Sequence, residues 1–205
     1  MKPIVLLACV CAISCCSAPE KFGNSIAKDE QLFPKEWKHK EVTLTLAGVD
    51  IPAKVELKST DTEREVKIFN GDVLLESEQY SVSAEGIGLK SFGPAEGETY
   101  DPPIPLVKQP MTVGEKIEWS GTYNVHDRRI PATATTETVV EQLPLATGAI
   151  ETLRCQVDLL IDDGSKQNVK RTVIVWFAKG LGPVKRDFGK QVRAPRVESS
   201  EGGKN

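Results

Sequence analysis

The chain has 205 residues, of which 40% are hydrophobic and 27% charged, and its formal net charge at pH 7 is -3. This mild acidity argues against a general nucleic-acid binder, which needs a basic surface. About 160 residues remain after an amino-terminal leader and a tether, enough for one domain with a proper core.

The chain begins with the layout of a bacterial secretory signal. Lys2 supplies a positive charge, and an unbroken apolar run follows from Ile4 to Ile13. This run is too short for a membrane span, because ten helical residues cover only about 15 Å. Residues 1–14 are therefore predicted to be a signal peptide.

The paired cysteines Cys15 and Cys16 at the end of this run are typical of a lipoprotein signal, in which cleavage precedes a cysteine that is then acylated. Cleavage before Cys15 leaves the small residues Ala12 and Ser14 upstream, so Cys15 is the predicted lipidation site. Acylation of Cys16, or an unlipidated secreted chain, is the alternative. Several acyl chains would hold the protein permanently to a membrane. The leader resembles those of Gram-negative lipoproteins, whose sorting rule implies the outer membrane here, since no Asp follows Cys15.

The segments that flank the expected domain are polar. Residues 15–40 are predicted to be the lipidated amino terminus and a tether, with one helical turn between Ile26 and Phe33 that ends at Pro34. The tail at residues 198–205 is short and Gly-rich, and it is predicted to be disordered.

Between residues 41 and 197 apolar and polar residues alternate along many short segments, as in strands with one buried face. Asn70-Gly71 predicts a hairpin with a type I′ turn, and Asp162–Ser165 predicts a second turn. No window shows helical periodicity, so we predict an all-β fold: a single domain with a curved antiparallel meander sheet, forming a half-barrel or an open barrel. Two stacked sheets are the alternative. The expected strands include Val42–Leu46, Ala53–Lys58, Glu65–Ile68, Val73–Leu75, Tyr80–Lys90, Lys116–Asn124, Ala132–Glu141, Cys155–Ile161, Val169–Phe177 and Gly182–Phe188.

Two stretches stand apart from this alternation. Gly93–Pro110 is rich in proline and glycine, and proline donates no ladder hydrogen bond, so we expect a long crossing loop between two β halves. Arg171–Phe177 is apolar on both faces and is predicted to be a central strand that is covered on both sides.

Two motifs resemble those of uncharacterised secreted bacterial lipoproteins. The first is Asp101–Leu106 (DPPIPL) followed by Gly114–Gly121 (GEKIEWSG), and the second is Val175–Lys185 (VWFAKGLGPVK). Ile117 stands where that pattern commonly has Trp, and Phe177 where it has Tyr. The resemblance implies a curved antiparallel sheet, distantly like the half-barrels of lipoprotein-carrier proteins, and it implies no activity.

The large aromatic residues and glycines of these motifs have a structural interpretation. Trp119 and Trp176 are expected to pack in the core, with an aromatic ligand cradle as the alternative. Gly180 and Gly182 are expected to supply backbone angles that other residues avoid.

Residues with catalytic potential are few. Cys155 is the one cysteine beyond residue 16, and it lies on the apolar side of a strand, so we predict a buried thiol rather than a nucleophile. His39 falls in the tether, and His126 precedes Asp127 at an expected hairpin tip. Neighbouring strand residues point to opposite faces, so the His126-Asp127 pair is not interpreted as a catalytic dyad.

The sequence predicts no metal or other cofactor. Asp158, Asp162 and Asp163 lack the spacing of a calcium loop and are interpreted as parts of a solvated turn.

The carboxyl-terminal part of the domain carries excess positive charge. It could contact lipid phosphates, an anionic glycan or an acidic partner, or it could be a solvated face with charges that protect an edge strand. The residues are Lys179, Lys185, Arg186, Lys190, Arg193 and Arg196, against Asp187 alone.

Together these observations favour a non-enzymatic envelope lipoprotein that binds a protein partner or a lipid-like ligand on its curved sheet. A lipid carrier should have a large apolar cavity beneath a covering element. The alternative is a structural or assembly component of the envelope that acts through its strand edges, and a hydrolase is the least favoured class.

Overall fold

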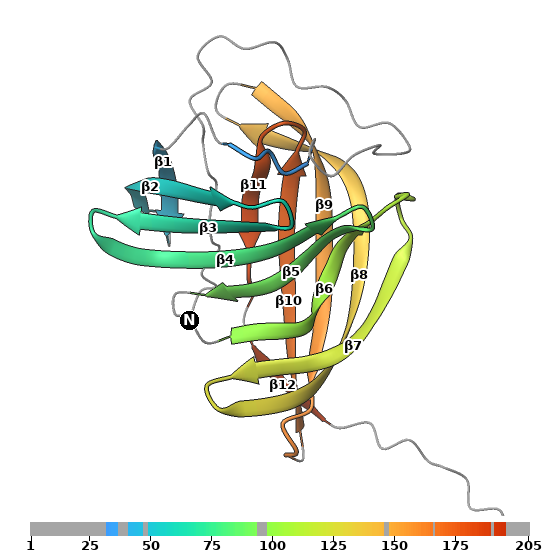
Figure 1. Ribbon diagram of the computed structural model, residues 1–205. Coiled ribbons are helices and arrows are strands. Elements are labelled where there is room, and N and C mark those ends of the chain that lie inside the picture. The colour runs from blue at the N-terminus through green and yellow to red at the C-terminus, as the bar shows by residue number, and fades with distance from the viewer. Residues whose placement is uncertain are drawn as a thin grey trace, which may run out of the picture.

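The computed structural model describes residues 32–36, 41–46, 49–93, 98–145, 148–165, 167–189 and 191–195. The predicted signal peptide, Cys15 and the carboxyl-terminal tail lie outside these residues. One sheet of 12 strands contains every strand of the described part, and its path runs in chain order from β1 to β11 (Figure 1). The strands are β1 (Glu41–Leu46), β2 (Val49–Ser59), β3 (Glu63–Asn70), β4 (Val73–Ser83), β5 (Gly86–Gly93), β6 (Glu98–Lys108), β7 (Lys116–Val125), β8 (Arg128–Leu145), β9 (Gly148–Ile161), β10 (Gln167–Ala178), β11 (Gly182–Asp187) and β12 (Val192–Pro195).

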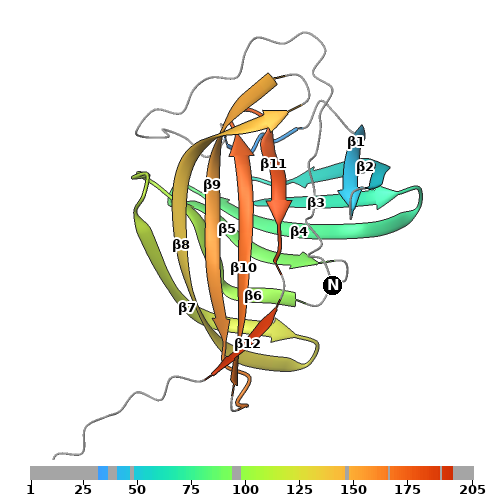
Figure 2. The ribbon, with the colours of Figure 1, turned by 180° about the vertical axis from the view of Figure 1, so that it is seen from behind.

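The sheet curls until its early strands lie across its late ones. Seen from opposite sides, β2 to β5 cross β9, β10 and β11 at a steep angle (Figures 1 and 2). The predicted all-β fold, a curved antiparallel meander that forms a half-barrel, is confirmed. One cluster of buried apolar side chains fills the concave face, from Val55 and Val66 on early strands to Val157 and Val175 on late ones. Among the described residues, no strand pairing joins β1 to β11, and no helix is long and apolar enough to cross a membrane.

Strand β10 is apolar on both faces, as predicted for Arg171–Phe177. It pairs with β9 on one side and with β11 and β12 on the other. Phe177 belongs to the main core, whereas Trp176 belongs to a smaller apolar cluster on the convex face, together with Val184. Trp119 packs in the main core, where its indole N–H donates to the carbonyl oxygen of Pro102 at 3.0 Å. Trp119 and Trp176 are therefore both buried in apolar clusters.

The crossing loop predicted for residues 93–110 is wrong, because β6 occupies most of this stretch and lies between β5 and β7. Its pairing with β7 covers Glu98 to Asp101 and stops before Pro102. From Pro102 onward β6 forms backbone pairs with β5 alone. Two register shifts interrupt this β5–β6 ladder. The missing N–H groups are thus tolerated as they are at a sheet edge, and one continuous meander replaces the two predicted halves.

The tight turns largely follow the sequence signals. The predicted β3–β4 hairpin is present, but its two turn residues are Gly71 (φ 56°) and Asp72, one position later than predicted. The single strand predicted over residues 80–90 is divided between β4 and β5. His126 (φ 51°) lies at the tip of the β7–β8 hairpin, as expected. Gly180 and Gly182 have φ values of 70° and 79°, which confirms their predicted role.

Part of the predicted tether belongs to the core. Leu32 and Phe33 are 0% exposed and join the main apolar cluster, although they precede the first strand. The ring of Phe33 lies 4.9 Å from that of Tyr80 and 6.1 Å from that of Phe177. We call Leu32 and Phe33 the inserted segment. It fills concave space that the strands do not fill with their own side chains.

Candidate functional site

The concave face of the half-barrel holds the inserted segment in an apolar seat. Tyr80 on β4 and Phe177 on β10 lie 6.3 Å apart, ring centre to ring centre, and the ring of Phe33 packs against both. The two strands come from opposite layers of the curled sheet (Figures 1 and 2). The inserted segment therefore lies between layers that no backbone ladder of the described strands bridges, and we call the surface around it the inner seat.

A charged cluster lies buried beside the inner seat. Alternate residues of a strand share a face, so Glu76, Glu78 and Tyr80 of β4 all point inward, where they are 7%, 0% and 0% exposed. Arg186 of β11, 1% exposed, pairs through Nε with Oε1 of Glu78. The Tyr80 hydroxyl donates to Oε2 of Glu78 at 2.7 Å. These four residues are the buried charged cluster, and it links β4 to β11 across the concave face.

Burial sets the protonation of this cluster. Loss of hydration raises the pKa of Glu76 well above its usual range, and the neighbouring Glu78 charge and a hydrogen bond to Glu78 raise it further. The Arg186 charge opposes this shift without cancelling it. Burial likewise raises the pKa of Tyr80, with Glu78 as the second cause. Glu76 thus retains a proton at pH values where a solvated Glu has lost it.

A second internal arginine ties other strands together. The Arg171 guanidinium lies 4.3 Å from the centre of the Phe92 ring, and its Nη1 is 3.2 Å from Oε2 of Glu98. Its Nε donates to the carbonyl oxygen of Phe188 at 2.9 Å. Because these contacts join β10 to β5, to β6 and to the residue after β11, we assign Arg171 a structural role.

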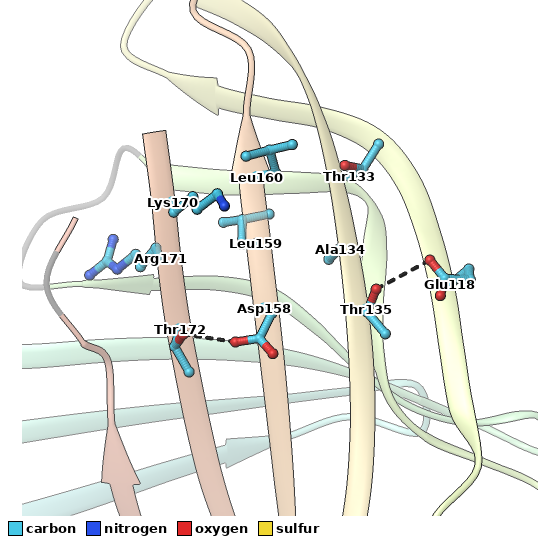
Figure 3. A pocket seen from close by; sticks show the side chains of 10 residues that line it. All are labelled: Glu118, Thr133, Ala134, Thr135, Asp158, Leu159, Leu160, Lys170, Arg171 and Thr172. Carbon is cyan, nitrogen blue, oxygen red and sulfur yellow. Dashed lines mark hydrogen bonds between the residues drawn. The ribbon is translucent and has the colours of Figure 1, made fainter. Parts of the chain in front are cut away.

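An open cleft lies on the convex face of β7 to β10 (Figure 3). Its volume is about 470 Å³. Four residues of this cleft lie in register across the neighbouring strands: Glu118, Thr135, Asp158 and Thr172. Thr135 donates to Glu118 at 3.2 Å, and Thr172 donates to Asp158 at 2.8 Å. The carboxylates of Glu118 and Asp158 thus each have a hydroxyl partner already. No group of three or more potential metal ligands occurs in the described residues. We therefore do not assign a ligand-binding or metal-binding role to this cleft.

The candidate chemical residues of the sequence do not come together. Cys155 is 0% exposed, as predicted, and burial raises its pKa, which disfavours the thiolate. His126 is exposed at its hairpin tip, and His39 lies outside the described residues. Asp162 and Asp163 accept backbone N–H groups of their own turn, at 3.1 and 3.0 Å. Asp158 is instead in the convex cleft.

The positive run predicted over residues 179–196 is not one surface. Arg186 faces the interior, so its inclusion was wrong. Lys185 lies over the Trp176 ring at 4.5 Å, and Arg193 is 3.6 Å from Asp163. Lys190 and Arg196 lie outside the described residues.

Sequence reasoning missed the buried charged cluster, although a signal for part of it was present. Glu76 and Glu78 alternate in phase with Tyr80 and Val82, so the same period of two that marks a core face also marks these carboxyl groups as inward. The inward direction of Arg186 was harder to predict. The β10–β11 ladder shifts register between Trp176 and Phe177, so inward and outward side chains do not alternate regularly along β11.

No family model, curated protein or solved structure matches the chain. The features of the molecule that bear on its function are the half-barrel, its inner seat and the buried charged cluster.

Proposed function

We propose that the protein is a non-enzymatic envelope lipoprotein, anchored through Cys15 to the outer membrane, whose inner seat binds a lipid-like ligand. The observation that carries this proposal is the complete burial of Leu32 and Phe33 between the two layers of the sheet. A ligand with an apolar chain would replace the inserted segment. The leader sequence and the cysteine at its end support the anchor and the location.

The energy that holds the inserted segment is compatible with exchange. Full burial of a Leu or Phe side chain contributes about 1.5–3 kcal/mol, so the two together contribute about 3–6 kcal/mol. Further along the chain, Pro34 is half-buried, Lys35 and Glu36 are exposed, and the surface pair between Lys35 and Asp61, at 3.6 Å, is worth about 0–1 kcal/mol. A ligand with a dissociation constant of about 1 μM has a binding free energy of about -8 kcal/mol, which is enough to displace the segment.

A binding role also suits the placement of the reactive side chains. Cys155 is enclosed in the core, and His126 is at a hairpin tip. A hydrolase would need a nucleophile beside a base, and these two residues belong to different regions of the sheet.

Binding at the inner seat is tested with the variant Leu32→Ala/Phe33→Ala and a fluorescent alkyl probe. We expect the variant to bind the probe about tenfold more tightly or better, because the competing side chains are gone. Val73→Ala, at a residue that is 63% exposed, is the matched control. Equal probe affinity in the double variant and the control would refute an inner seat that the segment occupies.

The anchor is tested by mass spectrometry of the mature amino terminus and of the lipids and proteins that accompany the membrane-purified protein. We expect an acylated Cys15 and a reproducible bound lipid. An unmodified amino terminus would refute the anchor.

A second candidate, assembly through strand edges, is favoured by the ends of the sheet path. Within the described strands β1 pairs only with β2, and β11 only with β10. A stoichiometric protein partner in place of a lipid would favour this candidate.

A further inference from the structure

The inner seat leads directly into the buried charged cluster. Tyr80 belongs to both: its ring centre is 4.9 Å from that of Phe33, and its hydroxyl donates to Glu78 at 2.7 Å. A molecule that replaced Phe33 would therefore have an aromatic wall along its chain and ionisable groups one side chain away. This arrangement of an apolar wall followed by buried charge fits an amphiphile rather than a wholly apolar ligand.

The acceptors of the cluster are not equally satisfied. Glu78 pairs with Arg186 and accepts a hydrogen bond from Tyr80. Glu76 is 7% exposed, and no N–H or hydroxyl group among the described residues donates to its Oε1 atom. Its partner across the ladder to β3 is the apolar Ile68. An ionised carboxylate buried in this way is costly unless a cation accompanies it.

The charges that face Glu76 identify what it could accept. Glu78 lies on its own strand and Arg186 on β11, so the cluster has two carboxyl groups for one guanidinium. With both carboxylates ionised the cluster has a net charge of -1, which one monovalent cation neutralises. An anionic head group would instead meet two carboxyl groups and an arginine that is already paired.

We infer that the buried charged cluster is a head-group site, and that it binds the primary ammonium of an amphiphile whose alkyl chain takes the place of Leu32 and Phe33. An ammonium has three donors and one positive charge, so it supplies both what Oε1 of Glu76 lacks and what the cluster needs. This inference rests on the proposed function of the inner seat and adds the chemical class of its ligand.

Binding by this route is coupled to a proton. While the inserted segment fills the seat, burial and the neighbouring Glu78 charge favour the protonated form of Glu76. When the ammonium arrives, Glu76 gives that proton to solvent, and the resulting carboxylate pairs with the ammonium. No covalent bond forms between the protein and the ligand. The signature is proton release on binding, which a purely apolar ligand does not produce.

The experiment is calorimetric titration of the full mature protein with decylammonium, decanol and decanoate, at about pH 6 and in two buffers of different ionisation enthalpy. We expect decylammonium to bind about tenfold more tightly than decanol, and decanoate to bind more weakly than either. We expect only decylammonium to release a proton. In Glu76→Gln, which keeps the shape of the neutral acid, the amine preference and the proton release should both disappear. Glu137→Gln, at an exposed position, should behave as wild type.

The three ligands separate the two proposals. If none binds to the wild type or to the Leu32→Ala/Phe33→Ala variant, the inner seat itself is refuted. If all three bind alike without proton release, the seat stands and the ammonium site is refuted. A preference for decanoate also overturns the ammonium site, because it would make Arg186 the group that recognises the ligand.

Discussion

Replacing Arg186 with methionine is expected to lower the free energy of unfolding by about 3–5 kcal/mol, because Glu78 then remains buried without its cation. Their side chains are 2% and 0% exposed, so solvent cannot screen the loss. Domains of this size are typically stable by about 5–15 kcal/mol, and the variant would lose a large part of that margin. The cost is high because the pair spans β4 and β11, which no backbone ladder joins.

Urea unfolding followed by tryptophan fluorescence measures this effect. Arg193→Met is the matched control, since Arg193 is 60% exposed in its pair with Asp163 and should cost about 0–1 kcal/mol. The double variant Glu78→Leu/Arg186→Met should regain most of the loss, because it removes both charges and leaves neither unpaired. If Arg186→Met costs no more than Arg193→Met, the buried pair does not hold the curl of the sheet.

Three further predictions concern single residues. The raised pKa of Glu76 means that the native state binds its proton more tightly than the unfolded state does, so stability relative to Glu76→Gln should fall as pH rises from the ordinary value of 4.5; parallel pH profiles in urea unfolding would contradict this. Gly86→Ala should cost about 2 kcal/mol or more in thermal unfolding, because φ is 135° and a Cβ would overlap the carbonyl oxygen of Val107. Gly164→Ala, with a φ of 77° in open space, should cost only about 1 kcal/mol, and equal losses would count against this reasoning. Finally, thiol reagents should modify Cys155 only after unfolding, and peptide-resolved labelling of the native protein would show otherwise.

The all-β half-barrel could be predicted from sequence because a period of two in hydrophobicity is a local property. Each alternating segment marks its own buried face, and turn residues such as Gly71 mark where one strand ends. The burial of Cys155 could be predicted for the same reason. These features depend on neighbours in the chain and on few long-range contacts.

The elements that could not be predicted depend on context elsewhere in the fold. Prolines such as Pro102 argue against a strand, yet β6 tolerates them because its pairing with β7 has already ended. Phe33 lies in a polar stretch, and only the gap between distant strands makes it a core residue. Arg186 reads as a surface charge until the curl of the sheet brings Glu78 opposite to it.

The way the half-barrel closes has a mechanical consequence. In the described strands every backbone ladder runs between neighbours along the path from β1 to β11, with β12 on β10, whereas β4 meets β10 and β11 through side chains. Moving β4 away from β10 and β11 therefore breaks side-chain contacts and leaves the backbone ladders intact. We call this contact without a ladder the joint. A ligand chain could enter along this joint without any strand unfolding, and the amide protons of β4 and β11 would stay protected while the seat exchanges its occupant.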